Sequence, residues 1–155
     1  MIGKVRLIKH AELSQLLSLY QHLNTDDPLL EMDKSLLDHW NEICSDPNLF
    51  YFAVEEEGRL ISSCNLTIIK NLTRSARPYA LIENMVTDPA FRKRGYGTAV
   101  LSKAVETARE KNCYKVMLMT SRKDEATLNF YEQAGFKKGE KTGFIMRFQG
   151  QEESE

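Results

Sequence analysis

Long apolar runs and targeting signals are absent from the 155-residue sequence. No stretch approaches the roughly 20 consecutive apolar residues that a membrane-spanning helix requires. The first residues also lack the long apolar core of a signal peptide. We therefore expect a cytoplasmic protein.

Cysteine pairs are missing as well. The three cysteines, Cys44, Cys64 and Cys113, are widely spaced, and no two of them form a CxxC motif. The three histidines do not stand at metal-ligand spacing from them. We expect reduced thiols and no metal site, as is usual for a protein of a reducing compartment.

The sequence also lacks an excess of positively or negatively charged residues. Lysine and arginine number 21, and aspartate and glutamate number 22. This balance argues against a general nucleic-acid binder or a protein of the membrane surface, although a local basic patch remains compatible with it.

What the chain does have is the composition of one globular domain, with 42% hydrophobic and 28% charged residues. A chain of this length buries about two-thirds of its unfolded surface, so it needs no disulfide or metal for stability. We expect one domain over residues 1–149 and a disordered acidic tail over residues 150–155.

The periodicity of apolar residues predicts alternating strands and helices. In chain order, we expect a strand over 4–9, a helix from Leu13 to Leu23, a helix over 34–44 with Leu36, Leu37, Trp40 and Ile43 inside, paired strands over 48–56 and 59–70, a strand over 79–87, a helix over 96–110, a strand over 115–120, a helix over 128–134, and closing strands over 136–137 and 144–148. This order predicts an α/β domain with a mixed central sheet flanked by helices. The early strands would be antiparallel, and the helix over 96–110 would form a right-handed crossover.

A glycine-containing basic turn precedes the helix over 96–110. Gly95 and Gly97 allow the backbone to turn sharply and to approach a ligand closely. The first N–H groups of a helix are unpaired, and the helix dipole adds partial positive charge there. Arg92, Lys93 and Arg94 add three cations at the same end. The turn therefore predicts a phosphate site, although a basic surface turn that leads into a helix would have the same residues.

Two common nucleotide motifs do not fit this turn. A Walker loop requires Gly-Lys-Ser/Thr, whereas Thr98 and Ala99 follow Gly97. A dinucleotide fingerprint requires a third glycine at the position of Val100. The phosphate ligand must be of another kind.

The surrounding sequence resembles the GNAT superfamily of acyl-CoA-dependent N-acetyltransferases. The pyrophosphate loop of that family, Arg/Gln-x-x-Gly-x-Gly/Ala, matches Arg92-Lys93-Arg94-Gly95-Tyr96-Gly97. An apolar strand over 81–86 precedes the loop and a long helix over 98–110 follows it, as in the family. A later family motif matches Phe130-Tyr131-Glu132-Gln133-Ala134-Gly135-Phe136. The resemblance covers residues 5–148 and is specific from Ala80 to Phe136.

The resemblance implies that acetyl-CoA is the co-substrate and that the GNAT fold is present. Backbone groups of the strand would pair with the pantetheine arm, which places Asn84, Met85, Val86 and Thr87 at the coenzyme. Backbone N–H groups of the loop would hold the pyrophosphate; the residues are Arg92, Lys93, Arg94, Gly95, Tyr96, Gly97 and Thr98.

One coenzyme contact departs from the family pattern. Asn129 lies one turn from the usual coenzyme-contacting asparagine and could bond the pantetheine or the 3′-phosphoadenosine arm. The asparagine that the family commonly places seven residues before the tyrosine is Asp124 here, which puts that hydrogen bond in doubt.

The resemblance also implies two catalytic residues. An alkyl amine with a pKa of about 10.4 is mostly protonated at neutral pH, and Glu83, an acid within an apolar strand, could accept its proton. Glu83 could instead position the substrate or simply face solvent. Tyr131 stands at the position of the family's general acid. Its alternative role is that of a helix tyrosine whose ring packs in the core.

The acceptor is less constrained by the sequence. Asn112-Cys113-Tyr114-Lys115, followed by Phe130-Tyr131, is similar to the corresponding region of glucosamine-6-phosphate N-acetyltransferases. This favours a small amine, an amino sugar or a phosphorylated compound. A protein lysine or N-terminus is the alternative acceptor, and a non-catalytic acyl-CoA sensor is a third hypothesis. Family members are often dimers, so a homodimer through the closing strands is a further expectation.

Overall fold

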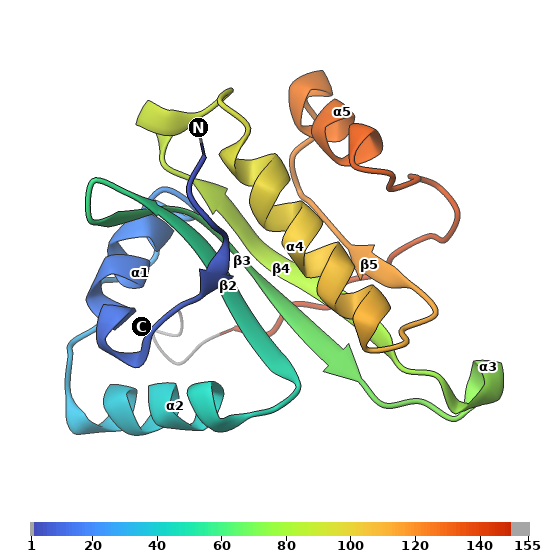
Figure 1. Cartoon of the computed structure of the whole chain (residues 1–155), viewed down its shortest axis with the longest axis horizontal. Coiled ribbons are helices and arrows are strands. Elements are labelled where there is room, and N and C mark those ends of the chain that lie inside the picture. The colour runs from blue at the N-terminus through green and yellow to red at the C-terminus, as the bar shows by residue number, and fades with distance from the viewer. Residues whose placement is uncertain (1, 150–155) are drawn as a thin grey trace. The chain divides into compact units, whose positions relative to one another are not determined.

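A five-stranded mixed sheet with the strand order β1-β2-β3-β4-β5 lies at the centre of the larger part of the chain (Figure 1). In this computed structural model residues 2–149 are described, and they divide into two compact units, 2–118 and 119–149, each of which is described by itself. The strands are β1 (Arg6–Leu7), β2 (Leu49–Glu56), β3 (Arg59–Ile69), β4 (Tyr79–Thr87) and β5 (Val116–Leu118). Strands β1 to β4 pair in sequence as antiparallel neighbours, and β5 runs parallel to β4. The expected α/β fold with a mixed sheet is confirmed.

The predicted hairpin turn between β2 and β3 is confirmed in its backbone. Glu57 and Gly58 both have positive φ angles, 52° and 76°. A two-residue turn of this kind matches the twist of the flanking strands. A single left-handed turn labelled α3 (Thr73–Ala76) then connects β3 to β4.

Helices cover both faces of the sheet. The short η1 (His10–Glu12), α1 (Leu13–Tyr20) and α2 (Lys34–Ser45) precede β2, and α4 (Tyr96–Glu110) connects β4 to β5. On β3, the thiol of Cys64 approaches the backbone oxygen of Val100 on α4, whereas the next side chain, Asn65, bonds Tyr20 on α1. Because successive side chains of a strand point to opposite faces, α1 and α4 lie on opposite sides of the sheet.

Helix α4 has the bounds that its sequence pattern predicts. Its buried residues recur at helical spacing, so one stripe faces the sheet; they are Tyr96, Val100, Leu101, Ala104, Thr107 and Ala108. Val105, next to Ala104 in the chain, is only partly buried. Thr107 is buried because its hydroxyl donates to the backbone oxygen of Lys103 at 2.8 Å.

The core on the other face is centred on Trp40 of α2. Its indole is 3% exposed, donates to the backbone oxygen of His10 at 2.8 Å, and meets the Tyr51 ring edge-on at 5.6 Å. Asp33 caps α2, since its carboxylate accepts from the backbone N–H of Leu36 at 2.9 Å, and aspartate is a favoured residue at this position. Leu37 is exposed, contrary to expectation, because it lies about 100° around the helix from Leu36 and the inner stripe.

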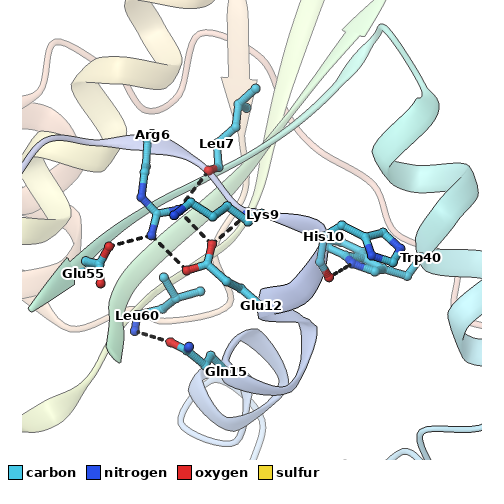
Figure 2. A network of polar contacts seen from close by, with 9 residues as sticks. All are labelled: Arg6, Leu7, Lys9, His10, Glu12, Gln15, Trp40, Glu55 and Leu60. Carbon is cyan, nitrogen blue, oxygen red and sulfur yellow. Dashed lines mark hydrogen bonds and ion pairs between the residues drawn. The ribbon is translucent and has the colours of Figure 1, made fainter. Parts of the chain in front are cut away.

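A partly buried ion-pair network ties β1 and η1 to β2 (Figure 2). The Arg6 guanidinium donates to both carboxylate oxygens of Glu12, at 2.8 and 2.9 Å, and to Glu55 at 2.8 Å. Gln15 on α1 accepts from the backbone N–H of Leu60 on β3 at 3.2 Å. These bonds hold α1 over the sheet although β1 is short.

In the smaller unit the main element is α5 (Glu125–Gln133). It begins three residues before the expected start because Asp124 caps it and accepts from the backbone N–H of Thr127 at 3.0 Å. Gly135, with φ of 100°, follows its last turn, and the backbone N–H of this glycine bonds the oxygen of Glu132. Glycine is favoured at such helix ends.

Several strand predictions are wrong or too long. The closing strands expected over 136–137 and 144–148 are not formed, and no strand follows α5 within the described residues. β1 and β5 cover only part of the expected ranges 4–9 and 115–120. Alternation of apolar residues indicates which face of a strand is buried, but it does not supply the neighbouring strand that makes the hydrogen bonds.

No helix within residues 2–149 has both the length and the apolar character needed to cross a membrane.

Candidate active site

Strand β4 has an open edge after Ile82. Its parallel pairing with β5 ends at the pair Ile82–Leu118, whereas β4 continues to Thr87. In the described part of β5, no residue pairs with 83–87. The backbone N–H and C=O groups on this edge are therefore available to an extended ligand that carries amides of its own.

A bulge in β4 lies at the same place. Asn65 pairs with Glu83 and Ser63 pairs with Val86, so two residues of β4, Asn84 and Met85, stand opposite one residue of β3. Asn84 has a φ of 54°, the left-handed region that asparagine tolerates better than most residues. Such bulges bend a strand and re-aim its side chains, and here the bulge separates Glu83 from Val86 at the start of the open edge.

The basic turn follows β4 through η2 (Pro89–Phe91). Asp88 accepts from the backbone N–H of Ala90 at 2.9 Å and fixes the start of this turn. Lys93 and Gly95 then have positive φ angles, 63° and 89°, and lead directly into α4. Alternation of this kind turns successive N–H groups toward one side, which suits an anion.

The start of α4 has no side-chain cap. Gly95 is the N-cap residue, and it makes no side-chain capping bond. The first bond of the helix runs from the N–H of Ala99 to the oxygen of Gly95 at 3.0 Å. The N–H groups of Tyr96, Gly97 and Thr98 precede that bond, so no helical carbonyl accepts from them.

Cations surround this helix start. Arg92, Lys93 and Arg94 are exposed, and the Arg94 guanidinium lies over the Phe91 ring at 5.4 Å. A Cβ atom at Gly95 would come within 3.0 Å of Cδ1 of Ile2, so both space and backbone conformation favour glycine there. The turn thus fits a diphosphate: free N–H groups, a helix dipole and nearby cations.

A polar row crosses the α1 face of the sheet beside the bulge. Tyr51, Asn65 and Glu83 are direct cross-strand partners on β2, β3 and β4. Tyr51 is partly buried, Asn65 is 7% exposed, and Glu83 is exposed. The row therefore leads from the core to the open edge and ends in a carboxylate.

The hydroxyl of Tyr20, on α1, makes a hydrogen bond to this row. It donates to Oδ1 of Asn65 at 3.1 Å. Burial raises the pKa of Tyr20, as does the nearby Tyr51 hydroxyl, while hydrogen bonds with Asn65 and Asn84 oppose the rise. Tyr20 is therefore a neutral hydroxyl at physiological pH, and it links α1 to both β3 and the bulge.

Tyr20 and Asn65 are not among the site residues predicted from the sequence. The available signal was the presence of Ser62, Ser63 and Asn65 within a strand that is otherwise apolar. Polar side chains that are buried in a central strand are unusual and need partners.

The remaining predicted residues lie in the smaller unit. Tyr131, on α5, is partly buried, and its ring contacts Phe130 at 5.0 Å and Phe136 at 6.4 Å between centroids. The backbone N–H of Phe136 donates to the oxygen of Tyr131 at 3.1 Å. The Phe-Tyr and Gly-Phe ends of the later motif are thereby brought together. Asn129 is exposed on the same helix.

Asp124, where the family commonly has asparagine, is used as a helix cap. Its carboxylate accepts from the hydroxyl of Thr127 at 2.8 Å and from Nε of Arg122 at 2.9 Å. These bonds lower the pKa of Asp124 to about 2, and the two bonds from Thr127 are the largest cause. The structure thus accounts for this residue by a local role in α5.

Among the described residues, the larger unit therefore holds Glu83, the open edge over 84–87 and the basic turn over 92–98, and the smaller unit holds Asn129 and Tyr131.

Comparisons with known proteins agree with this arrangement. Residues 16–136 match the Acetyltransferase (GNAT) family. The chain is 32% identical over 138 residues to a glucosamine 6-phosphate N-acetyltransferase of Trypanosoma brucei brucei, and the aligned region covers 89% of this chain and 91% of that protein. The structure of this chain is similar to that of a putative acetyltransferase from Agrobacterium tumefaciens, with a TM-score of 0.88 and 45% identity over 94% of this chain and 99% of the other.

A predicted acetyltransferase from Clostridium acetobutylicum, solved with acetyl-CoA, shares the fold, with a TM-score of 0.73 and 23% identity over 94% of this chain and 96% of that chain. Acetyl-CoA is the acyl donor of GNAT acetyltransferases, and the open edge and the uncapped helix start fit its amide-bearing arm and its diphosphate. The chain belongs to the GNAT family and is an acyl-CoA-dependent N-acetyltransferase.

Proposed function

We propose that this enzyme acetylates the primary amine of a small molecule, and specifically of an amino sugar phosphate. The observation that carries the proposal is the exposed carboxylate of Glu83, which stands between the open edge of β4 and the polar row on the α1 face. The similarity to a glucosamine 6-phosphate N-acetyltransferase over 89% of the chain supports the acceptor class.

The reaction sets the roles of the residues. A bond forms between the amine nitrogen and the acetyl carbon, the carbon–sulfur bond breaks, the amine gives up a proton, and the thiolate takes one up. Glu83 receives the amine proton, either directly or through a water molecule. Tyr131 is the general acid, since a phenol with a pKa of about 10 can protonate a thiolate whose thiol has a pKa of about 8.5.

Binding of the donor follows from the same assignment. The backbone of Asn84, Met85, Val86 and Thr87 pairs with the pantetheine amides. The uncapped N–H groups and cations over 92–98 bind the diphosphate. Asn129 contributes a further bond to the coenzyme from α5.

A screen of acceptors tests the proposed class. Purified enzyme is incubated with acetyl-CoA and each of a panel of amino sugar phosphates, aminoglycosides, polyamines, amino acids and lysine-containing or N-terminal peptides, and acetylated products are identified by mass spectrometry. We expect the highest kcat/KM on an amino sugar phosphate. Preference for a peptide would favour the alternative of a protein acetyltransferase.

Tyr131→Phe tests whether the chain is an enzyme with this acid or a sensor that only binds coenzyme. We expect turnover to fall by a factor of about 10² to 10⁴, while the Kd for acetyl-CoA, measured by calorimetry, changes little. Tyr114→Phe, which removes a hydroxyl from another partly buried tyrosine, is the control and should keep full turnover. Unchanged turnover of Tyr131→Phe would contradict the assignment.

The organisation and location of the protein are also proposals. We propose that residues 1–149 form the catalytic domain, that residues 150–155, which lie outside the described residues, form an acidic tail, and that the enzyme is cytoplasmic. We also propose a homodimer. Its support is the segment over 144–148, in which Phe144, Ile145, Met146 and Phe148 are 62–91% exposed in the single chain, because exposed apolar side chains of this density mark interaction sites.

A further inference from the structure

Strand β3 carries more buried polar side chains than its structural role requires. Ser62 faces α4, and its hydroxyl is satisfied by the backbone oxygen of Val86 at 3.1 Å and the hydroxyl of Thr87 at 2.8 Å. Ser63 and Asn65 face α1 and are 0% and 7% exposed. The hydroxyl of Ser63 has no hydrogen-bond partner within residues 2–149. A buried polar atom without a partner is uncommon and needs an explanation, such as a bound water or a ligand.

Asn65 is the polar residue of this pair that lies nearest to the proposed base. Its direct neighbour across the strands is Glu83, so their Cβ atoms are about 4.5–5.5 Å apart. Its Oδ1 accepts from the hydroxyl of Tyr20 at 3.1 Å. This bond restrains the rotation of the side-chain amide, and with Oδ1 as the acceptor the N–H group lies on the arm that points away from the Tyr20 hydroxyl.

The fixed amide leaves its N–H donors on the other arm of the side chain. The Glu83 carboxylate, at the exposed end of the row, is where the proposed amine gives up its proton. An acceptor whose nitrogen approaches Glu83 brings atoms two or three bonds from that nitrogen over the neighbouring residue of the row, which is Asn65. An oxygen at that place would accept a hydrogen bond from the amide N–H.

We infer that Asn65, oriented by Tyr20, is a specificity-determining residue that selects acceptors with an oxygen on the carbon next to the amine-bearing carbon, that is, vicinal amino alcohols. The inference rests on the proposed function and deepens it. Selection arises because an amine without that oxygen leaves a nearly buried N–H group unpaired when it displaces water from the site. Tyr20 is a positioning residue and does not touch the acceptor.

Two enzymes, each assayed on three substrates, measure this contact. The substrates are glucosamine 6-phosphate and its 3-deoxy and 1-deoxy analogues, each of which lacks one hydroxyl next to the amine-bearing carbon. The enzymes are wild type and Asn65→Leu, which keeps the size of the side chain and removes its donors. We expect wild type to prefer glucosamine 6-phosphate to one of the two analogues by about tenfold in kcat/KM, the value of one hydrogen bond.

In Asn65→Leu that preference should fall to within about twofold, with the KM for acetyl-CoA unchanged. Tyr20→Phe should reduce the preference part of the way, because the amide can then rotate. Thr67→Val is the control, since Thr67 lies two residues along the same face of β3 and the substitution keeps its shape; it should retain the full preference. Thermal unfolding of each variant separates a loss of selectivity from a loss of structure.

The outcomes distinguish the inference from the proposal beneath it. If wild type acetylates glucosamine 6-phosphate and Asn65→Leu loses activity equally on all three substrates, or loses none, the role of Asn65 is wrong and the proposed function stands. If wild type does not acetylate glucosamine 6-phosphate, the proposed acceptor class is wrong, and the inference is overturned with it.

Discussion

Glu83 combines three features that a base for an amine needs. It is exposed, it stands immediately before the bulge at Asn84, and it is the partner of the buried amide of Asn65. A carboxylate on an ordinary solvent-facing strand would lack polar neighbours such as Asn65 and Tyr51 on the side toward the core. The proposed catalytic role of Glu83 therefore depends on the residues around it more than on its charge.

Glu83→Gln should lower kcat/KM for the amine by a factor of about 10² to 10⁴, because the glutamine cannot accept the proton. The loss should shrink as the pH rises toward the pKa of the amine, since more of the amine is then already neutral. Steady-state rates measured between pH 6.5 and 10 check both expectations. Glu110→Gln, on the exposed end of α4, is the control; equal activity of both variants at neutral pH would leave Glu83 with a positioning role at most.

At the scale of elements, the proposed donor site is a strand edge followed by a helix start. β4 extends beyond the last residue that pairs with β5, and α4 begins without a side-chain cap. Both elements expose backbone groups, so most of the donor site does not depend on particular side chains. Gly95 is the exception, because its φ of 89° is strained for a residue with a side chain and an added Cβ atom would come within 3.0 Å of Cδ1 of Ile2.

Gly95→Ala should raise the KM for acetyl-CoA at least tenfold and lower the unfolding free energy by about 1–2 kcal/mol, the cost of a left-handed conformation in a residue with a side chain. Gly58→Ala is a matched control: its φ of 76° is similarly left-handed, and nothing lies within 4 Å of the added Cβ. Urea unfolding and steady-state kinetics measure the two effects. We expect both variants to lose stability, and a normal KM in Gly95→Ala would contradict the diphosphate site.

At the scale of the whole molecule, the N-terminal segment is held by charge. Arg6 contacts Glu12 and Glu55 with distances of 2.8 Å (Figure 2), and the Glu12 side chain is 12% exposed. The hydrogen bonds from Arg6 are the main cause that lowers the pKa of Glu12, and burial opposes them. Since β1 pairs only two residues with β2, this network adds to the burial of Leu13, Leu16 and Leu19 in attaching η1 and α1.

The contribution of Glu12 should depend on pH in one direction. A carboxyl whose pKa is lower in the folded state than in the unfolded state stabilises the fold above its ordinary pKa, and this stabilisation is lost as the pH falls through the lowered value. Glu12→Gln should therefore cost about 1 kcal/mol at pH 7, with solvent screening taken into account, and less at pH 3, which lies below the ordinary glutamate pKa of about 4.3. Urea unfolding at both pH values checks this. Asp38→Asn, which breaks the exposed pair with Lys34, should change stability little at either pH.

The proposed homodimer makes a prediction at the same scale. Phe144 and Leu72 are both 91% exposed in the single chain, but only Phe144 belongs to the apolar segment over 144–148. We expect wild type and Leu72→Glu to sediment as dimers and Phe144→Glu to sediment as a monomer in analytical ultracentrifugation. A monomeric wild type would contradict the dimer without affecting the catalytic assignments.

Local sequence was sufficient for most elements and for the donor site. The bounds of β4 and α4 and the cap of α2 agree with their patterns, because apolar periodicity, capping and turn chemistry act over a few neighbouring residues. The basic turn with Gly95 and Gly97 was recognisable for the same reason: consecutive residues form an anion site at a helix start. The prediction of strands over 144–148 failed because a strand also requires a partner, which the segment itself does not encode.

The acceptor side was decided by tertiary structure. Tyr20, Asn65 and Glu83 are 45 and 18 residues apart along the chain, and only the register of β3 against β4 and the packing of α1 on that face bring them into one row. The bulge at Asn84 also depends on pairing, because a one-residue shift in register would turn Glu83 to the opposite face. The sequence by itself therefore determined the family and the proposed place of the donor, whereas the fold decided which side chains lie together at the proposed amine site, since contacts between distant residues follow from register and packing and not from local pattern.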